Sequence, residues 1–466
     1  MSGPIVVLDI GKTNAKLLLL NAAGSCLWSA ERASPAQPAP DMAPLTRQLD
    51  VAGIEDWALA TLATMPGREA VRAIVPIAHG AAMVLLDAAG TRLLAPDYED
   101  PAFTQTQPAY RAQRPPFAET LSPALPAGLN LGAQIFFVQQ RLPALFARTS
   151  RLLTYPQYWS WRFSGMAASE VTSLGCHTDL WAPQQGEYSR LVAAQGWEGL
   201  LAPLRPAATP LGRLRPALAA SLGLPATCQV ICGIHDSNAS YLTYRIGRPP
   251  AAPFCVLSSG TWCVILASGA KLDGLDEAAD MLANVDALGV PTATARFMGG
   301  REYAAIAETE TPPTLAGLDE MLAAGAMALP GFALGGPFPG WAGRLLAADA
   351  LSPPARAALA SLYCALMADY ILERLQGQGP VLVDGPFAAN PLFPALLQAL
   401  RPQSPVEARA ARGGLAAAAL WLAGSPPSPA PPVPPPPTLP QAHALRAHRT
   451  AWRASLSPRL MGADAT

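Results

Sequence analysis

Two strand–turn–strand segments of the same plan, about 250 residues apart, most constrain what this chain can fold into. The first joins residues 5–10 to residues 16–20 through a polar turn that contains Gly11. The second joins residues 254–257 to residues 262–266 through a Ser-Ser-Gly-Thr turn. Short apolar runs joined by a tight glycine-containing turn are typical of β-hairpins. Two of them at this separation predict two lobes of related α/β architecture.

A shorter internal similarity lies near the start of the chain. The sequence LLLLNAAGSCLW begins at residue 17, and MVLLDAAGTRLL begins at residue 83. Each places an Asn or Asp and a glycine between two apolar runs, which is the composition of a tight turn. We therefore expect repeated hairpins that stack in one sheet.

Start and stop signals indicate several helices, including one that begins with Asn390 as its cap and Pro391 at its first position. An aromatic-rich segment opens at Tyr155 and stops at Gly165, and we expect its rings to be core. A longer apolar segment follows Ser352, a residue suited to cap a helix, and ends at paired glycines. An alanine-rich helix, the last expected in the chain, is predicted over residues 412–423.

These signals divide the chain into three parts. Residues 1–225 are expected to form an N-terminal lobe and residues 226–424 a C-terminal lobe. From Ser425 the sequence changes to PPSPAPPVPPPPTLP, which cannot pack as helix or sheet. We expect residues 425–466 to be an extended, proline-rich tail along the surface. A ligand for a polyproline-binding domain is the alternative interpretation.

Composition indicates in which cellular compartment the protein works and which kinds of partner it does not bind. The net charge is −1 with 14% charged residues, so we expect neither nucleic acid nor a membrane as partner. The seven cysteines are scattered without zinc-finger spacing and predict buried thiols in a reducing compartment. The start of the chain lacks the features of a signal peptide, and no uninterrupted apolar run has the length of a membrane span. A soluble, cytoplasmic protein is expected.

The turn after the first strand has the composition of a phosphate-binding turn. Asp9 lies at the end of the strand, and Gly11, Thr13 and Asn14 follow it. Such a turn can wrap backbone N–H groups around a phosphate while the carboxylate holds Mg²⁺ through water. An ordinary polar hairpin is the alternative.

Three other positions could take part in chemistry. Gly260 and Thr261 form a second candidate phosphate turn, with a β-turn without ligand as the alternative. Asp236 follows a strand at a predicted helix start, where it could cap the helix or accept a hydroxyl proton during phosphoryl transfer. His79 precedes Gly80 at a strand end, from which a side chain can project into a cleft. There is no GxxxxGK[ST] motif, so a P-loop fold is not expected.

Taken in order, these segments resemble the FGGY carbohydrate kinase family, within the actin, Hsp70 and hexokinase superfamily. The likeness runs over residues 5–424. VVLDIGKTNAKLLL is similar to the family's first phosphate motif, and ICGIHDSNAS to the stretch that carries its catalytic base. VLSSGTWCVI is similar to the phosphate motif of rhamnulose, fuculose and xylulose kinases. VLVDGPFAANPLFPALL occupies the place of the adenosine motif, and ARGGLAAAALWLAG matches the late Gly/Ala-rich helix.

The resemblance implies a fold and a set of roles. The fold is α/β, with two actin-like (ribonuclease H-like) lobes and an active-site cleft between them. Asp236 would be the catalytic base, and Asp9 would organise Mg²⁺. The expected ATP contacts are Gly11, Thr13, Asn14, Lys16, Gly260, Thr261, Gly385 and Asn390. The expected sugar contacts are His79, Gly80, Asp100, His235 and Asp236.

The implied activity is transfer of the γ-phosphoryl group of MgATP to a hydroxyl of a small sugar. A ketose of the rhamnulose, fuculose or xylulose type is expected, and a homodimer is compatible with the resemblance. Two departures leave the nucleotide and the sugar open. Pro386 and Phe387 stand where relatives have further glycines, and Lys12 and Asn14 stand where many have small or hydroxyl residues. A sugar-binding regulator without catalysis and an ATP hydrolase of the same fold are the alternatives.

Overall fold

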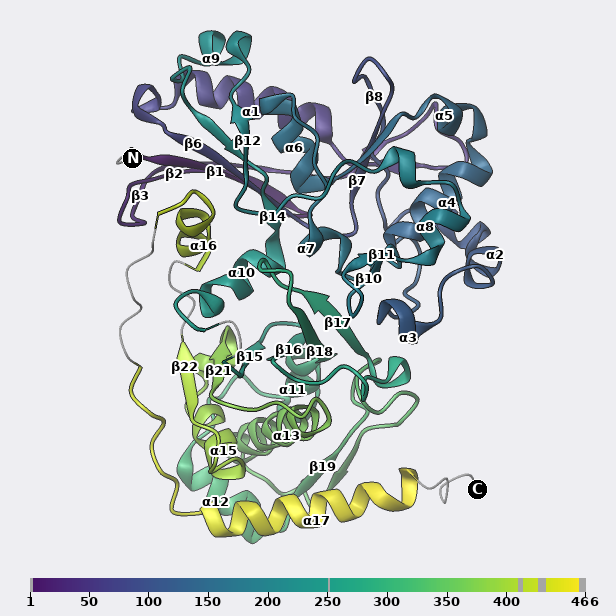
Figure 1. The fold of residues 1–466 in the computed structure, drawn as a ribbon. Coiled ribbons are helices and arrows are strands. Elements are labelled where there is room, and N and C mark those ends of the chain that lie inside the picture. Colours follow the sequence, from purple (N-terminus) through teal and green to yellow (C-terminus); the bar gives the residue numbers. More distant parts are fainter. Residues whose placement is uncertain (1–2, 250–251, 410–413, 426–432, 461–466) are drawn as a thin grey trace. The chain divides into compact units, whose positions relative to one another are not determined.

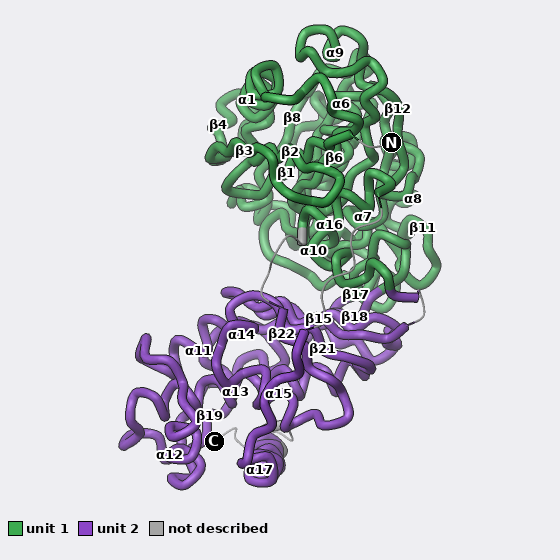
Figure 2. Tube along the Cα trace, turned by 90° about the vertical axis from the view of Figure 1, so that its left-hand side faces the viewer, with its two compact units in different colours: residues 1–247, 283–291, 413–429 green, residues 248–282, 292–412, 430–466 purple. Residues whose placement is uncertain are grey.

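The computed structural model divides the chain into two compact units (Figure 2), and each unit is built from separate stretches of sequence. The residues that the structure describes are 3–249, 252–409, 414–425 and 433–460. The first unit comprises residues 1–247, 283–291 and 413–429, and the second comprises 248–282, 292–412 and 430–466. The chain leaves the first unit after residue 247, beyond the boundary expected at residue 225. The helix that carries Asp236 therefore belongs to the first unit.

A mixed seven-stranded sheet forms the centre of the first unit (Figure 1). The strand order is β12-β13-β6-β1-β2-β3, and β14 also pairs with β6. β1 runs antiparallel to β2 and parallel to β6, so the first predicted strand–turn–strand segment is present. The strands are β1 (Ile5–Ile10), β2 (Asn14–Leu20), β3 (Cys26–Ala33), β6 (Ala73–Ala78), β12 (Pro210–Arg213), β13 (Gln229–Ile231) and β14 (Ile234–His235).

The alternating side chains of β1 build a core on each face of this sheet. The even-numbered residues from 6 to 10 share a buried cluster with α1 (Val51–Thr64) and α6 (Tyr155–Ser164). The odd-numbered apolar residues share another with α10 (Asp236–Arg245) and α16 (Gly414–Leu422). Successive residues of a strand point to opposite faces, so one short strand serves both cores. The alanine-rich segment was correctly predicted as a helix, and it completes the first unit.

The two similar hairpins do not stack in one sheet, so that prediction is wrong. β2 and β3 belong to the seven-stranded sheet, whereas β7 (Met83–Leu86) and β8 (Arg92–Leu94) form a separate sheet with β9 (Arg151–Thr154). Asn21 and Asp87 occupy equivalent positions in the two turns. Each side-chain oxygen accepts hydrogen bonds from the N–H groups two and four residues further on. The sequence similarity therefore reflects shared turn chemistry and not a shared sheet.

Helix α6 matches its prediction. It ends at Gly165, which has a φ of 84°, and the rings of Tyr155, Trp159 and Phe163 are buried. Glycine is favoured there because a side chain disfavours this left-handed conformation. The other helices of the first unit are α2 (Gln107–Arg111), α3 (Phe117–Thr120), α4 (Leu131–Arg141), α5 (Pro143–Arg148), α7 (Val171–Leu174), α8 (Arg190–Ala194) and α9 (Pro216–Leu222). Its short strands are β4 (Gln37–Pro38), β5 (Arg47–Gln48), β10 (Trp181–Ala182) and β11 (Glu187–Tyr188).

A six-stranded sheet of order β17-β18-β16-β15-β21-β22 characterises the second unit. β15 and β16 form the second predicted strand–turn–strand segment. The strands are β15 (Phe254–Ser258), β16 (Cys263–Ser268), β17 (Met281–Val285), β18 (Pro291–Phe297), β21 (Val381–Asp384) and β22 (Val406–Arg409), beside the pair β19 (Met327–Leu329) and β20 (Arg344–Leu346). The helices are α11 (Gly299–Ala307), α12 (Leu315–Ala323), α13 (Pro353–Arg374), α14 (Pro386–Ala389), α15 (Phe393–Leu400) and α17 (Ala442–Leu460).

Helix α13 is the central core helix of the second unit. Among the described residues it is the one helix long and apolar enough to cross a membrane, but 89% of its most apolar window is buried inside the protein. Ser352 precedes it as predicted. The Ser352 hydroxyl donates to Glu320 at 2.6 Å instead of capping the helix. Burial on all sides explains the apolar composition.

The cysteines are mostly core residues. Six are buried and Cys26 is exposed. Burial raises the pKa of Cys228, Cys255 and Cys263 to about 12, so these groups are thiols at neutral pH. The prediction of buried thiols is confirmed for the six.

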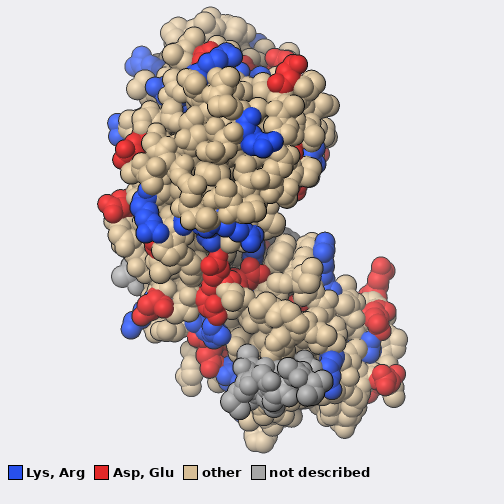
Figure 3. Space-filling model, turned by 90° about the vertical axis from the view of Figure 1, so that its right-hand side faces the viewer, with Lys and Arg blue, Asp and Glu red and all other residues tan. Residues whose placement is uncertain are grey.

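Charges are spread thinly over the surface. On the face drawn in Figure 3, basic and acidic side chains occur in small groups among uncharged residues. This mixture agrees with the net charge of −1.

The end of the chain differs from the predicted tail, because residues 442–460 form a helix within the second unit. Leu445 and Trp452 of α17 are completely buried, and Trp452 Nε1 donates to the Ala328 carbonyl at 2.9 Å. Part of the proline run, residues 426–432, lies outside the described residues. Leu445, Trp452 and Leu456 recur at helical spacing, a signal that the proline-rich composition obscured.

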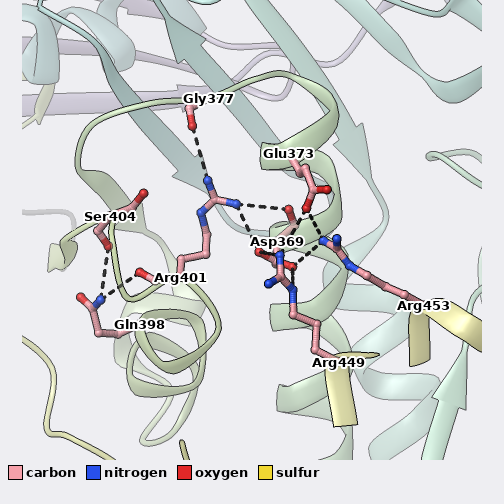
Figure 4. Close-up of polar contacts among 8 residues, drawn as sticks. All are labelled: Asp369, Glu373, Gly377, Gln398, Arg401, Ser404, Arg449 and Arg453. Carbon is pink, nitrogen blue, oxygen red and sulfur yellow. Dashed lines mark hydrogen bonds and ion pairs between the residues drawn. The ribbon is translucent and has the colours of Figure 1, made fainter. Parts of the chain in front are cut away.

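Ionic contacts fasten α17 to α13 (Figure 4). The buried carboxylate of Asp369 accepts hydrogen bonds from Arg401 at 3.2 Å, Arg449 at 2.6 Å and Arg453 at 2.9 Å. One turn later, Glu373 pairs with Arg449 at 3.2 Å and Arg453 at 2.5 Å. The hydrogen bond from Arg453 lowers the pKa of Glu373. Three guanidinium groups around one buried carboxylate offset the cost of its desolvation.

Asp369→Asn should destabilise the second unit by about 3 kcal/mol, because it leaves several guanidinium groups without their buried partner. Urea unfolding and protease cleavage within α17 would measure the change. Asp349→Asn is the matched control, since Asp349 is an exposed acid of the same unit. Equal stability of the two variants would contradict this role of Asp369.

Candidate active site

The ends of three parallel strands bring polar residues together in the first unit. The last residues of β1 and β14 both pair with the last residue of β6, so these strands end level with one another. Asp9 lies one residue before the end of β1, His79 directly follows β6, and Asp236 directly follows β14. Three side chains from distant parts of the sequence therefore meet at one edge of the sheet.

A pocket of about 440 Å³ opens at this edge. It contains the acid of β1, the turn that follows it and the first turns of α10. Its lining residues are Asp9, Gly11, Thr13, Asn14, Lys16, Asp236, Ser237, Ser240 and Leu415. The first six of these were predicted from the sequence, and the last three were not. The structure thus places the predicted phosphate turn and the predicted base in one pocket.

The Asp9 carboxylate has its pKa raised to about 6. Burial is the main cause, the Asp236 carboxylate adds to it, and Lys16 acts in the opposite direction. Lys16 Nζ also lies 3.4 Å from Glu31 Oε2, so its charge is shared. The carboxylate of Asp236 beside that of Asp9 favours a cation in the pocket that both residues line.

Magnesium fits this arrangement only with ligands from outside the protein. No group of three or more His, Cys, Asp or Glu side chains within the described ranges is placed to hold a metal. Mg²⁺ commonly binds through one or two carboxylates, keeps several waters and takes phosphate oxygens as further ligands. Asp9 and Asp236 match this small donor set.

Asp236 is the first residue of α10 and does not cap it. The N-cap position belongs to His235. Asp236 Oδ1 accepts a hydrogen bond from the Ser237 N–H at 2.6 Å and lies 3.2 Å from His235 Nε2. Its Oδ2 accepts no hydrogen bond from the residues that the structure describes. One carboxylate oxygen is therefore held, and the other remains able to accept a proton at the positive end of a helix.

The imidazole of His235 lies beside this carboxylate. The ring is buried, and its Nδ1 lies 3.4 Å from Asn238 Nδ2. An amide nitrogen donates, so Nδ1 accepts and the proton of the neutral ring lies on Nε2, facing Asp236. Burial lowers the pKa of His235, whereas the Asp236 carboxylate acts to raise it. A neutral imidazole thus turns its Nε2–H side toward Asp236 Oδ1, 3.2 Å away.

A second layer of hydrogen bonds holds His235 and Asn238. Thr172 Oγ1 accepts from the His235 N–H at 3.2 Å, and the Thr172 carbonyl accepts from Asn238 at 3.5 Å. The buried Glu170 accepts from the Thr172 hydroxyl at 2.5 Å. Burial raises the pKa of Glu170 to about 7. Sequence reasoning missed these supports, because no local motif relates residues 170 and 172 to the helix that starts at 236.

Gly80 provides room for His235. A Cβ at position 80 would lie 2.6 Å from His235 Nε2, closer than real contacts allow. His79 is buried beside it, with its ring edge-on to Tyr98 at 5.9 Å and to Tyr155 at 5.0 Å. Burial lowers the pKa of His79. The predicted histidine–glycine turn therefore lies next to His235, and its glycine has a packing role.

Both carboxylate oxygens of Asp100 accept hydrogen bonds from other residues of the protein. Its Oδ2 accepts hydrogen bonds from Thr46 N at 2.7 Å, Thr46 Oγ1 at 2.9 Å and Arg47 N at 2.7 Å. Its Oδ1 accepts from Ala102 N at 2.8 Å, and the residue is fully buried. Burial would raise the pKa of Asp100, but these hydrogen bonds lower it overall. A carboxylate used in this way positions its loop, in place of the direct sugar contact expected from the sequence.

Lys12, which departs from the family pattern, has acidic and aromatic neighbours that account for its presence. Its ammonium forms an ion pair with the buried Asp97 and lies 3.6 Å from Glu99 Oε2. It also lies 4.4 Å from the ring centroid of Tyr98. A lysine beside a carboxylate and an aromatic face is stabilised by both. The unusual lysine thus contacts the acidic segment of residues 97–100.

A second candidate pocket, of about 730 Å³, lies in the second unit. It forms where the parallel strands β15 and β21 end. The predicted residues Gly260, Thr261 and Asn390 line it, together with Tyr303 and Phe387. These two aromatic rings lie 6.1 Å apart and were not predicted. A polar turn beside aromatic side chains suits a ligand with both a phosphate and a flat ring.

Gly385 is required by the turn below this pocket. Its φ is 76°, and a Cβ there would lie 2.1 Å from the Ser259 carbonyl oxygen. The Ser259 hydroxyl accepts from the Phe387 N–H at 2.9 Å, which ties the two turns together. Pro386, where relatives have a further glycine, takes the first position of α14. The departure from the adenosine motif is accommodated as a helix start.

Asn390 braces the next helix. Its Oδ1 accepts from the N–H groups of Leu392 at 3.0 Å and Phe393 at 2.9 Å. Its Nδ2 donates to the Ser361 hydroxyl at 3.1 Å. Both the oxygen and the nitrogen of the Asn390 side chain therefore form hydrogen bonds within the protein, and the residue also lines the pocket.

Known proteins share this architecture along most of the chain. A carbohydrate kinase from Novosphingobium aromaticivorans is 36% identical, with a TM-score of 0.89 over 98% of this chain and 99% of that one. A xylulose kinase from Rhodospirillum rubrum is 18% identical, with a TM-score of 0.78 over 97% of this chain and 98% of that one. The predicted α/β fold with two actin-like lobes is confirmed.

Sequence comparisons agree with the structural ones. Residues 251–431 match the family model described as carbohydrate kinase FGGY, C-terminal domain. The L-fuculokinase of Salmonella typhi is 26% identical over 280 residues, which span 58% of this chain and 57% of that protein. The match therefore spans little more than half the length of this curated relative. The chain belongs to the FGGY carbohydrate kinase family, as the resemblance predicted.

Gly80→Ala should displace the His235 ring, because the new methyl group would overlap Nε2. We expect a stability loss of about 1–3 kcal/mol and a change in the His235 tautomer signals in nitrogen-detected NMR. Gly199→Ala is the control, since no atom lies within 4 Å of a Cβ at that position. Unchanged His235 signals in Gly80→Ala would contradict the packing argument.

Proposed function

We propose that this protein is an ATP-dependent carbohydrate kinase. It transfers the γ-phosphoryl group of MgATP to a hydroxyl of a small sugar, with Asp236 as the general base. The observation that supports this most directly is the Asp236 carboxylate at the start of α10, held by the Ser237 N–H and facing a pocket that it shares with residues 11–16. Family membership supports the same reaction class.

In the proposed step, Asp236 Oδ2 accepts the proton of the sugar hydroxyl. The hydroxyl oxygen forms a bond to the γ-phosphorus while the bond from that phosphorus to the bridging oxygen of ADP breaks. The Ser237 N–H holds Oδ1 by a hydrogen bond of 2.6 Å, and His235 Nε2 lies 3.2 Å from the same oxygen, so the carboxylate presents its other oxygen. Positioning and charge neutralisation supply most of the catalysis in phosphoryl transfer, so an ordinary carboxylate suffices.

Two sets of nucleotide contacts are proposed, one within each unit. Backbone N–H groups near Gly11 and the side chains of Thr13, Asn14 and Lys16 would contact phosphate oxygens. Mg²⁺, held by Asp9 through water, supplies charge neutralisation on the phosphates when it is bound. Gly260 and Thr261 would hold phosphate, while Tyr303 and Phe387 would pack against the base.

A ketose is the proposed substrate class, of the rhamnulose, fuculose or xylulose type. Relatives named L-fuculokinase and xylulose kinase support this choice. A structure named gluconate kinase, 14% identical with a TM-score of 0.76, shares the fold and makes sugar acids worth testing. A non-catalytic sugar-binding regulator and an ATP hydrolase of the same fold are the alternatives to be tested.

Coupled ADP release with MgATP, across a panel of ketoses, aldoses, polyols and sugar acids, tests this function. We expect one ketose to stimulate ADP release and Asp236→Asn to reduce the stimulated rate about 10²–10⁴-fold, because general-base catalysis is lost. Asp56→Asn is the matched control, since Asp56 is an exposed acid on α1.

The same experiment separates the alternatives. Steady ATP turnover that no sugar changes would indicate a hydrolase. Sugar binding by calorimetry without ADP release would indicate a regulator. A fully active Asp236→Asn variant would overturn the assignment of the base.

Tyr303→Ala should raise the KM for ATP about tenfold, equivalent to about 1.4 kcal/mol, because the aromatic wall of the second-unit pocket is removed. The kcat and the KM for the sugar should change little. Leu334→Ala, at a residue 88% exposed in the same unit, is the control. An unchanged KM for ATP beside a raised KM for the sugar would contradict the assignment of this pocket to the nucleotide.

A further inference from the structure

A third pocket, of about 570 Å³, lies in the first unit and shares no lining residue with the pocket at Asp236. It is formed by the β7–β8 turn, the start of β9, α6 and the residue that precedes α9. Four arginines line it: Arg92, Arg151, Arg162 and Arg215. None of the roles described above uses this pocket.

The charges in this pocket are strongly unequal. Four guanidinium groups face only two carboxylates, those of Glu55 and Asp87. Glu55 pairs with Arg162 at 2.6 Å and with Arg92 at 3.6 Å. Asp87 is occupied by its own turn, where Oδ1 accepts two backbone N–H groups at 2.9 and 2.8 Å. The pocket therefore carries an excess of positive charge.

Two of the arginines lack an acidic partner among the described residues. Arg151 lies exposed at the first position of β9. Arg215 lies with its guanidinium carbon 5.4 Å from the ring centroid of Trp161 and donates to the Trp161 carbonyl at 3.4 Å. Its buried Nε has no hydrogen-bond partner in the described part of the chain. A buried donor without a partner costs free energy, which an anionic ligand nearby would help to offset.

An aromatic wall completes the pocket. Trp161 and Tyr158 of α6 line it, and Tyr158 OH lies 3.1 Å from Arg92 Nη1. The β7–β8 turn packs onto the indole because residue 90 is glycine, with φ 82° and a hypothetical Cβ only 2.9 Å from Trp161 Cζ2. Sequence-distant elements thus build a cavity with charged and aromatic sides.

We propose that this pocket binds a small phosphate-bearing metabolite. The planar guanidinium fork matches phosphate oxygens, and the aromatic side chains offer a surface for the organic part of the ligand. The volume lies within the range of small-molecule sites. The excess of arginines over acids selects an anion over a neutral sugar.

Isothermal titration calorimetry on the full chain, saturated with MgADP to fill the nucleotide pocket, tests this proposal. The probes are glucose 6-phosphate, glucose as its uncharged counterpart, and inorganic pyrophosphate. We expect a phosphorylated probe to bind and glucose not to bind here. Arg151→Gln should weaken that binding at least fivefold, whereas Glu55→Gln should strengthen it by releasing Arg92 and Arg162. Arg148→Gln is the control, because Arg148 is an exposed arginine that does not line the pocket.

The outcomes separate the sources of phosphate and the ways in which the proposal could fail. Binding of glucose 6-phosphate assigns the pocket to sugar phosphates, and binding of pyrophosphate alone assigns it to polyphosphates. Either result supports the site if Arg151→Gln and Glu55→Gln change affinity in opposite directions. Absence of binding by both anions, or equal weakening by Arg151→Gln and Arg148→Gln, would overturn it.

Discussion

Backbone pairing of β6 with β1 on one side and β14 on the other brings the candidate active site together. Hydrogen bonds between the parallel strands bring the three strand ends level with one another. The polar residues at these ends lie close together because of that register. Asp9 and Asp236 lie far apart in the sequence, yet both line one pocket. The absence of a Cβ at Gly80 then leaves room for the His235 ring beside the Asp236 carboxylate.

Helix α6 contacts the segment before Asp236 on the one hand and lines the arginine-rich third pocket on the other. Gln157 donates to the Cys232 and Gly233 carbonyls at 3.1 and 3.2 Å, which holds the segment that leads into Asp236. Trp161 of the same helix lines the third pocket, the one that contains four arginines. Buried polar groups need hydrogen-bond partners, and Gln157 of α6 provides them for two backbone carbonyls in the segment that leads into Asp236.

Several acids of this protein serve structure rather than chemistry, and composition alone cannot distinguish the two uses. Asp100 binds backbone N–H groups, Asp97 pairs with Lys12, and Asp369 gathers three arginines from separate segments. A buried carboxylate needs such donors because its desolvation is costly. Asp236 differs in lining a pocket, with one oxygen held by the Ser237 N–H, a distinction visible only once its neighbours are in place.

The sequence by itself determined the paired strand–turn–strand plan, the family, the helix ended by Gly165 and the polar turn that begins at Gly11. Those features depend on local turn chemistry and short-range periodicity, which neighbouring residues in the sequence specify. Only the tertiary structure decided the sheet that each hairpin joins, the packing of α17 and the hydrogen-bond support that begins at Glu170. Those outcomes depend on contacts between segments distant in sequence, where burial and hydrogen-bond satisfaction select one arrangement among many that are locally acceptable.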